Sequence, residues 1–152
     1  MSREIKFRAW DKVNKCWLLQ LNPQGAPISN HFINFDGYVW SRSNINGGSQ
    51  DSYSQNEIEL MQYTGLKDKN GKEIYEGDIL RFTEVDEDSA FEREETHTGV
   101  VEWINEISQW RFVYPSGQRR ELHLVTDFES VYKCAVLGNI YENPELLSSD
   151  NK

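Results

Sequence analysis

Closely spaced turn signals restrict the fold of this sequence more than any other feature. Asp36-Gly37, Asn70-Gly71 and Pro115-Ser116-Gly117 separate runs of only a few apolar and aromatic residues. Asp-Gly and Asn-Gly accept the left-handed backbone that tight turns need, and such turns join antiparallel strands. The chain is therefore predicted to be mainly β, with short strands and little helix.

The runs between the turns have the patterns of strands. Ile5, Phe7 and Ala9 alternate with charged residues, which is typical of a half-buried strand in an N-terminal hairpin. Pro144–Leu147, with Pro at a first helical position after Asn143, predicts one helical turn. Further strands are expected over residues 16–19, 32–35, 38–40, 57–63, 79–85, 100–104, 110–114 and 131–140, with a less regular segment over 119–129.

Composition divides the chain into two regions and a tail. Residues 1–56 hold β-hairpins and end in a polar segment, 41–56, which we interpret as a loop or linker because it has almost nothing to bury. Residues 57–147 are expected to form an antiparallel meander that closes into a small barrel. Residues 148–152 are expected to be a disordered tail. Whether the two regions form one domain or two stays open.

The charge of the chain is strongly negative, and much of it is local. Lys and Arg number 16 against 25 Asp and Glu, giving a net charge of -9, which disfavours nucleic acid as a partner. We interpret residues 84–95 as a poorly ordered acidic loop that is dispensable for folding. The sharper alternative is a DNA-mimicking or cation-attracting surface that occupies a basic groove on a host protein. The acids are Glu84, Asp86, Glu87, Asp88, Glu92, Glu94 and Glu95.

The sequence contains no signal for export, membrane insertion or metal binding. The longest apolar runs are four residues, against about 20 for a membrane span. Cys16 and Cys134 lie too far apart for a zinc motif, and His31, His97 and His123 lack ligand spacing. We therefore expect a cytoplasmic protein with reduced thiols, no membrane contact and no cofactor.

The glycine-rich stretch 64–78 resembles a phosphate-binding loop only superficially. A P-loop leads into a helix, whereas Gly65, Gly71 and Gly77 precede a predicted strand. We interpret the stretch as a structural turn in which Asp78 accepts hydrogen bonds from backbone amides.

Aromatic and arginine residues are the candidate partner contacts. Trp10 and Trp40 lie at polar-flanked strand ends, so we expect exposed rings there, whereas Trp103 and Trp110 are expected in the core. Arg119 and Arg120 are adjacent and are candidate contacts to a protein or to phosphates. No combination of nucleophile, base and oxyanion donor is present, so no enzymatic activity is expected.

The longest distinctive motif is QYTGLKDKNGKEIYEGDIL at residues 62–80, flanked by REIKFRAWD at 3–11 and VLGNIYENPELL at 136–147. Together these stretches resemble the YopX family of phage and prophage proteins. The resemblance implies an SH3-like β-roll in the C-terminal part and an origin in a phage or prophage of a low-GC Gram-positive bacterium. It implies no activity and no catalytic residues.

Two functional hypotheses follow. The first is a non-enzymatic interaction module that binds a protein partner, either a host factor or a second copy of itself, because unused hairpin edges must be paired, covered or charged. The alternative is a nucleic-acid-binding SH3-like module that uses Arg119, Arg120 and the neighbouring Trp110 and Arg111.

Overall fold

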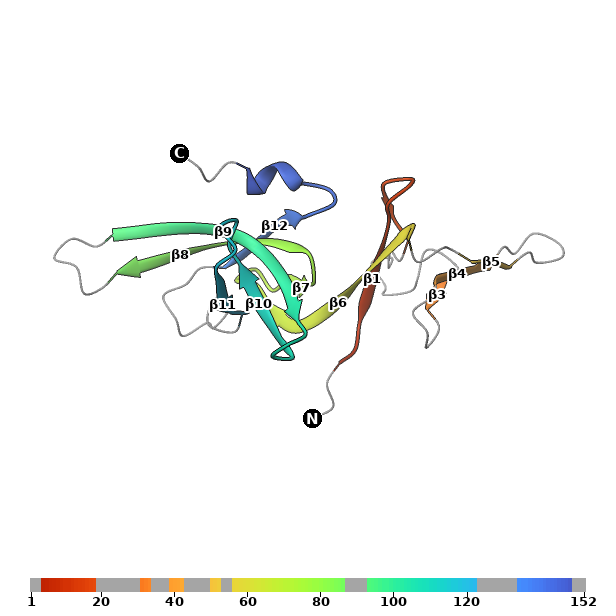
Figure 1. Cartoon of the computed structure of the whole chain (residues 1–152), viewed down its shortest axis with the longest axis horizontal. Helices are drawn as coiled ribbons and strands as arrows, with labels where there is room; N and C mark the ends of the chain where they lie inside the picture. Colours follow the sequence, from red (N-terminus) through yellow and green to blue (C-terminus); the bar gives the residue numbers. More distant parts are fainter. Residues whose placement is uncertain are drawn as a thin grey trace. The chain divides into compact units, whose positions relative to one another are not determined.

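The structure, a computed structural model, describes residues 4–18, 31–33, 39–42, 50–52, 56–86, 93–122 and 134–148. These residues confirm the prediction of a mainly β fold, and no helix among them is long and apolar enough to cross a membrane. The elements (Figure 1) are β1 Phe7–Asp11, β2 Cys16–Trp17, β3 His31–Ile33, β4 Val39–Arg42, β5 Gln50–Ser52, β6 Ile58–Lys67, β7 Glu73–Tyr75, β8 Asp78–Asp86, β9 Arg93–Ile104, β10 Gln109–Val113, β11 Arg119–Glu121, β12 Ala135–Asn139 and the 3-10 helix η1 Pro144–Leu147.

The chain divides into two compact units. One unit comprises Lys6–Gln62, and the other comprises Met1–Ile5 together with Tyr63–Lys152. The division falls inside β6, C-terminal to the boundary at residue 56 that the composition suggested. Residues 149–152, where a disordered tail is expected, lie outside the described residues.

In the N-terminal unit, β1 pairs with both β2 and β6 in antiparallel register, which confirms the predicted N-terminal hairpin. The turn between β1 and β2 is closed by Asp11, whose Oδ1 accepts hydrogen bonds from the amides of Val13 and Asn14, each at 2.8 Å. Ala9 and Ile58 are buried in a small core between these strands.

The second sheet of this unit has the order β3-β4-β5. Phe32 lies opposite Trp40, as a hairpin around Asp36-Gly37 predicts. The interpretation of 41–56 as a loop is wrong in part, because Ser41 of β4 pairs with Asp51 of β5. Every residue except proline carries a backbone donor and acceptor, so polar segments can form a ladder without an apolar side chain.

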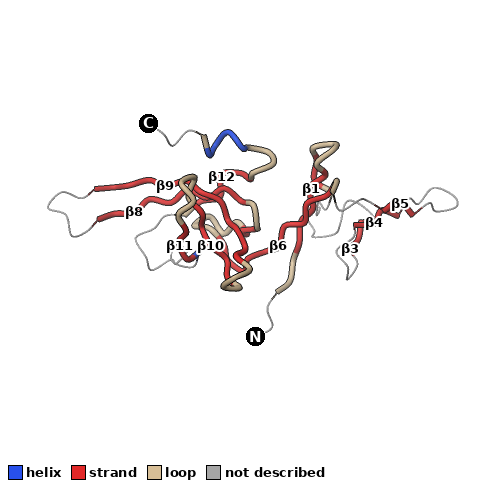
Figure 2. Tube along the Cα trace, in the orientation of Figure 1, coloured by secondary structure: helices blue, strands red, loops and turns tan. Residues whose placement is uncertain are grey.

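The C-terminal unit contains a five-stranded antiparallel sheet of order β11-β10-β9-β8-β12, curled into a half-barrel (Figure 2). Strands β8 to β11 follow one another as the predicted meander. Phe82 and Phe112 form the centre of its core at a ring distance of 5.0 Å. The other buried members are Ile74, Leu80, Val101, Leu122 and Cys134.

Two close approaches shape this unit. A Cβ atom on Gly99 would lie 2.5 Å from both Phe112 Cζ and the Val113 carbonyl oxygen, so only glycine fits at this position of β9.

The predicted helical turn after Asn143 is present as η1, but the side chain of Asn143 makes no capping hydrogen bond. That side chain lies against Gly138 instead.

Candidate functional site

The glycine-rich stretch, residues 64–78, forms a structural turn. Gly65, Gly71 and Gly77 all have left-handed φ values, of 91°, 80° and 75°. Asp78 Oδ2 accepts a hydrogen bond of 2.8 Å from the backbone amide of Tyr75, just ahead of β8. The stretch leads into strands β7 and β8, as its structural interpretation requires.

The centre of this turn is Asp68, which sequence reasoning did not single out. Its side chain is 1% exposed and accepts backbone hydrogen bonds from Asn70 and Lys72, and also from the distant Val136. Burial raises the pKa of this carboxyl, but the amide donors outweigh burial and hold the pKa below its ordinary value. The Asp-Lys-Asn-Gly run was the available signal, because Asp and Asn form such side-chain turns.

The two cysteines lie in different environments. Burial raises the pKa of Cys134 to about 12, and the negative charge of Asp68 adds to the shift. Cys16 is exposed. No group of three or more potential metal ligands gathers within the described ranges.

The second candidate feature is a two-stranded arm. β12 pairs with β8 only as far as Arg81, and β10 pairs with β9 only from Val100 onwards. The pairing of β8 with β9 continues beyond both neighbours to Asp86 and Arg93, and Figure 1 shows the two strands running on together. We call residues 82–86 and 93–98 the β8–β9 arm.

The arm corrects the prediction of an acidic loop. Glu84 lies opposite Glu95 in a continuous antiparallel ladder, so both ends of the expected loop are strand. Backbone hydrogen bonds hold the ladder although like charges directly opposite each other are unfavourable. The remaining acids of the segment, Glu87, Asp88 and Glu92, lie outside the described residues.

One edge of the arm has no pairing strand among the described residues. The carbonyl of Val101 accepts a hydrogen bond from the Gly77 amide, so the backbone groups of Val101 face β8. Backbone groups of successive residues face alternate sides of an antiparallel strand, and the β8–β9 register is unbroken. The groups of Thr98 and Thr96 therefore face away from β8, where β10 has already ended.

One further observation supports this alternation. Thr83 Oγ1 and Thr96 Oγ1 are 3.3 Å apart, as expected for the closely spaced, non-hydrogen-bonded type of cross-strand pair. Thr98 is 3% exposed, and its hydroxyl has no hydrogen-bond partner in the described part of the chain. Thr96 is exposed. Among the residues of this edge whose burial is described, Thr96 is therefore the accessible one, and it borders a hollow that Tyr114, Pro115, Ser116 and Leu147 also line.

The third feature is an open hollow of about 380 Å³ in the same unit. Trp103 and Trp110 lie opposite each other on β9 and β10, with ring centroids 5.0 Å apart and ring planes at 66°. We call this hollow the aromatic groove. It is lined by Thr64, Leu66, Trp103, Ser108, Gln109, Trp110, Glu121 and Leu122.

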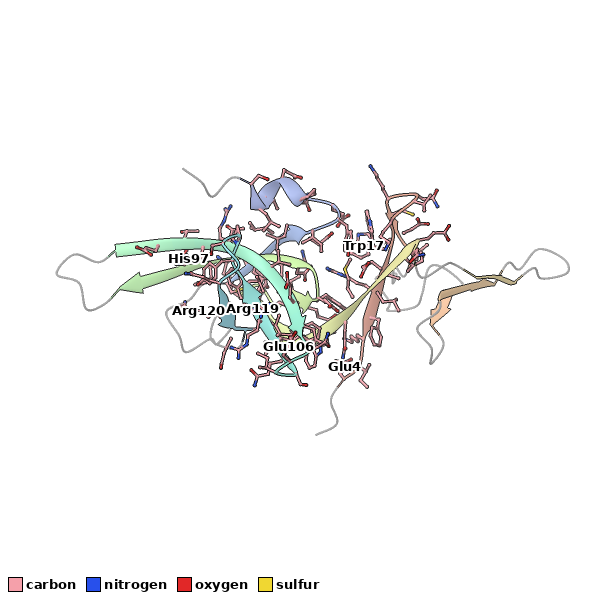
Figure 3. All side chains as sticks on the ribbon, viewed as in Figure 1. Glu4, Trp17, His97, Glu106, Arg119 and Arg120 are labelled. Carbon is pink, nitrogen blue, oxygen red and sulfur yellow. The ribbon has the colours of Figure 1, made fainter. Side chains whose placement is uncertain are left out.

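Charges beside the aromatic groove form a row across three strands. Arg111 lies between Glu102 of β9 and Glu121 of β11 in the strand register. Its Nη1 atom is 3.2 Å from Glu121 Oε1, and its Nη2 atom donates to Gln109 Oε1 at 2.9 Å. The row holds two carboxylates and one guanidinium. Figure 3 labels a further acid, Glu106, in the turn between β9 and β10.

One tryptophan, Trp10, is placed differently from the prediction. Trp10 is only 6% exposed and packs edge-on against Trp17 at 5.0 Å, so the prediction of an exposed contact there is wrong. The hairpin that carries Trp10 covers it with its own second strand. Trp40 is in β4, but its side chain lies outside those described. Trp103 and Trp110 are half-buried, and Trp110 packs against the core.

The two adjacent arginines do not form one cationic patch. Both lie on β11, where Figure 3 labels them, but successive residues of a strand point to opposite faces. Arg119 is exposed, whereas the guanidinium carbon of Arg120 is 5.6 Å from the centroid of the Phe82 ring. The prediction of Arg120 as a surface contact is corrected, because this side chain packs on the core.

Comparison with known proteins gives a family and similar solved structures. The model of a family described as YopX protein matches residues 6–148. The crystal structure of protein EF1440 from Enterococcus faecalis is similar at 28% sequence identity and a TM-score of 0.51, covering 96% of this chain and 99% of that chain. No curated protein matches the chain.

Proposed function

The chain belongs to the YopX family, and from that premise we propose that it is a non-enzymatic protein-interaction module. It is an accessory protein of a phage or prophage, acts in the cytoplasm of the bacterial host, and has an SH3-like roll in its half-barrel. The observation that carries the proposal is the open edge of β9 on the acidic arm.

An open strand edge is a template for another strand. The amide and carbonyl of Thr96 face away from β8 and have no pairing strand in the described ranges. An extended segment of a partner can bond to these groups and add a strand to the sheet. The partner gains main-chain hydrogen bonds, and its alternate side chains lie along the arm.

The negative charge of the arm favours a partner strand that is positively charged. Its described residues include four acids, Glu84, Asp86, Glu94 and Glu95, against the single base Arg93. A second copy of the arm would place like charges opposite one another, which is unfavourable. The edge therefore suits a basic strand from a different protein and disfavours self-association.

Nucleic acid fits the same surface poorly. The arm repels phosphate, and two of the arginines that the nucleic-acid hypothesis relied on are engaged within the chain. Arg111 is paired with Glu121, and Arg120 packs over the ring of Phe82. We therefore keep nucleic-acid binding as the alternative hypothesis, which the test below can support or reject.

The test uses proline to block one edge. Thr96→Pro removes an amide that faces away from β8, so the β8–β9 ladder keeps its hydrogen bonds. The probe is a short peptide alternating lysine and valine, and its twin carries N-methyl groups on alternate amides. We expect the plain peptide to slow hydrogen exchange at Thr96 and to bind Thr96→Pro about tenfold more weakly, as the loss of one or two hydrogen bonds implies.

The matched control is Thr83→Pro. Thr83 lies opposite Thr96 in the arm, and its amide faces the other edge, so this variant should bind the peptide normally. Equal binding of the N-methylated twin would show attraction by charge alone and overturn strand addition. Loss of binding in Thr83→Pro only would move the site to β8. Salt-sensitive binding of DNA or RNA oligonucleotides would favour the nucleic-acid module instead.

A further inference from the structure

The hollow beside Thr96 lies where β10 leaves β9. The last residue of β10, Val113, pairs with Val100. If β10 continued in this register, Pro115 would lie opposite Thr98. Proline has no backbone N–H and cannot donate to a neighbouring strand, so the pairing ends and the chain turns towards β11. The place beside Thr98 that a longer β10 would fill is left as a hollow of about 210 Å³.

This hollow, which we call the edge hollow, adjoins the edge of β9 proposed for strand addition. Thr96, His97 and Thr98 line it from β9, and Leu147 lines it from η1. Residues 114–116, which follow β10, complete the lining. β10 occupies this side of β9 from Val100 onwards, so a strand added to the arm has to end beside the edge hollow.

The lining of the edge hollow includes a buried hydroxyl group. Thr98 is 3% exposed, and its Oγ1 atom has no hydrogen-bond partner in the described part of the chain. A hydroxyl that is buried without a partner is unfavourable. Rotation about the Cα–Cβ bond between staggered positions exchanges the hydroxyl with the methyl group, so either group can face the hollow. A ligand that bonds to this hydroxyl removes the unfavourable contribution.

The size and the charge of the lining favour a small, uncharged side chain. A volume of about 210 Å³ is below the range of small-molecule sites, which begins at about 300 Å³, but it exceeds the cavity of about 150 Å³ that holds a benzene molecule. The lining residues, all of them described, include no carboxylate, lysine or arginine. A charged side chain would therefore lose water there without gaining a counter-ion. A hydroxyl both donates and accepts, so it can pair with Thr98 in either sense.

We infer that the edge hollow receives a serine or threonine side chain at the end of the bound partner strand, and that its hydroxyl pairs with the hydroxyl of Thr98. This inference rests on the proposed function, because it defines the residue with which the added strand ends. The partner segment is then basic along the arm and carries an uncharged hydroxyl residue where it meets β10.

The test compares two versions of the alternating lysine–valine peptide. One carries threonine at both ends, so that either strand direction brings a hydroxyl to the edge hollow, and the other carries valine at both ends. Valine has nearly the shape of threonine but lacks the hydroxyl. We expect the threonine peptide to bind about fivefold more tightly in calorimetric titrations, as one additional buried hydrogen bond implies. Equal binding of the two peptides would overturn the inference.

Three variants locate the hydrogen bond. Thr98→Val should reduce the preference for threonine to less than about twofold, whereas its urea midpoint should not fall, because an unpaired hydroxyl is removed. Thr98→Ser keeps the hydroxyl and should keep the preference, which also tests the inference if Thr98→Val does not fold. The matched control is Thr83→Val, whose hydroxyl is on the arm but outside the lining of the edge hollow. A preference that persists in Thr98→Val, or that Thr83→Val removes equally, would overturn the inference.

The two proposals fail in different ways. If both peptides bind equally tightly and Thr96→Pro weakens both, strand addition stands and only the inference about the edge hollow fails. If neither peptide binds to the unchanged protein, strand addition fails and this inference fails with it.

Discussion

The Oδ2 atom of Asp68 accepts a hydrogen bond of 3.0 Å from the backbone amide of Val136, so one carboxylate joins the loop after β6 to β12. Its Oδ1 atom accepts the amides of Asn70 and Lys72 at 2.8 and 2.9 Å. The amide of Lys69 donates to the carbonyl of Cys134 beside it. The turn that the family resemblance marks most strongly is therefore also a tie between distant parts of the C-terminal unit.

Replacing this carboxylate should destabilise the protein. Asp68→Asn keeps one acceptor oxygen but turns an amide donor towards buried backbone donors, so we expect a loss of about 2–4 kcal/mol in the free energy of unfolding. Urea denaturation followed by circular dichroism measures it. The matched control is Asp11→Asn, whose carboxylate bonds only to residues two and three positions away. An equally large loss in Asp11→Asn would show that the hydrogen bond from Val136 to Asp68 adds little to the stability that local hydrogen bonds provide.

The same carboxyl predicts a loss of stability in acid. Its pKa in the folded state lies below the ordinary value of 3.8, because the amide donors together outweigh the effect of burial. The stabilisation is therefore present above the unfolded pKa and is lost as pH falls through the folded pKa. Urea midpoints measured from pH 6 towards acid should fall less steeply below about pH 4 in Asp68→Asn. Parallel curves for the two proteins would contradict this assignment.

Replacing Gly99 or Gly117 by alanine should destabilise the protein, for different physical reasons. Gly99→Ala forces a Cβ against Phe112 and the Val113 carbonyl, and overpacking of this kind costs about 1–3 kcal/mol. Gly117→Ala meets no atom within 4 Å, so only its φ of 83° is unfavourable, at about 1 kcal/mol. Thermal unfolding of both variants compares the two costs. A smaller loss at Gly99 would mean that β9 and β10 move apart easily.

The two thiols should differ in reactivity. Cys134 is 2% exposed, and burial raises its pKa to about 12, so almost no thiolate forms at neutral pH. Cys16 is exposed. A thiol-specific reagent should modify Cys16 in the folded protein and reach Cys134 only after denaturation. Rapid modification of folded Cys16→Ser would show that the C-terminal unit opens readily at β12.

Replacing Trp110 by phenylalanine should change the stability of the protein little. Its indole N–H is buried and has no hydrogen-bond partner in the described part of the chain, so Trp110→Phe removes an unsatisfied donor along with part of the ring. We expect the free energy of unfolding to change by less than about 1 kcal/mol. A large loss in urea denaturation would show that the contacts of the indole with the core outweigh the removal of the unsatisfied donor.

The fold class was readable because turn residues act locally. Asp36-Gly37 and Asn70-Gly71 require backbone conformations that few other residues accept, and the strands between such turns follow from alternation. The hairpin pairing of β1 with β2 and that of β3 with β4 were predicted on this basis. The tie from Asp68 to Val136 was not, because nothing local marks which distant amide a carboxylate will meet.

The structure of the acidic segment, in contrast, did not follow from its local composition. Its composition predicts that a short turn joining Thr83 to Gly99 would preserve the fold, and such a turn would remove His97 and Thr98. The ring of His97 lies 5.0 Å from that of Phe82, and Thr98 is buried. Repulsion between carboxylates is a side-chain effect, whereas the ladder is made by the backbone, so charge density alone did not reveal the arm.

The aromatic groove was beyond sequence reasoning for a geometric reason. Its lining comes from β6, from the β9–β10 hairpin and from the end of β11, which are brought together only by the curl of the sheet. Trp103 and Trp110 looked like core residues because strand aromatics usually are. Which face of a half-barrel stays open depends on packing between elements, and periodicity does not report it.

The position of β12 has a consequence during synthesis of the chain. β8 lies between β9 and β12, yet β12 begins about 50 residues after β8 ends. At about 5–20 residues per second, a ribosome leaves that edge of β8 unpaired for about 2–10 s. Neighbouring nascent chains on one messenger RNA then expose the same edge to each other. β12 then pairs with Asp78–Arg81 and removes this part of the edge from contact with other chains.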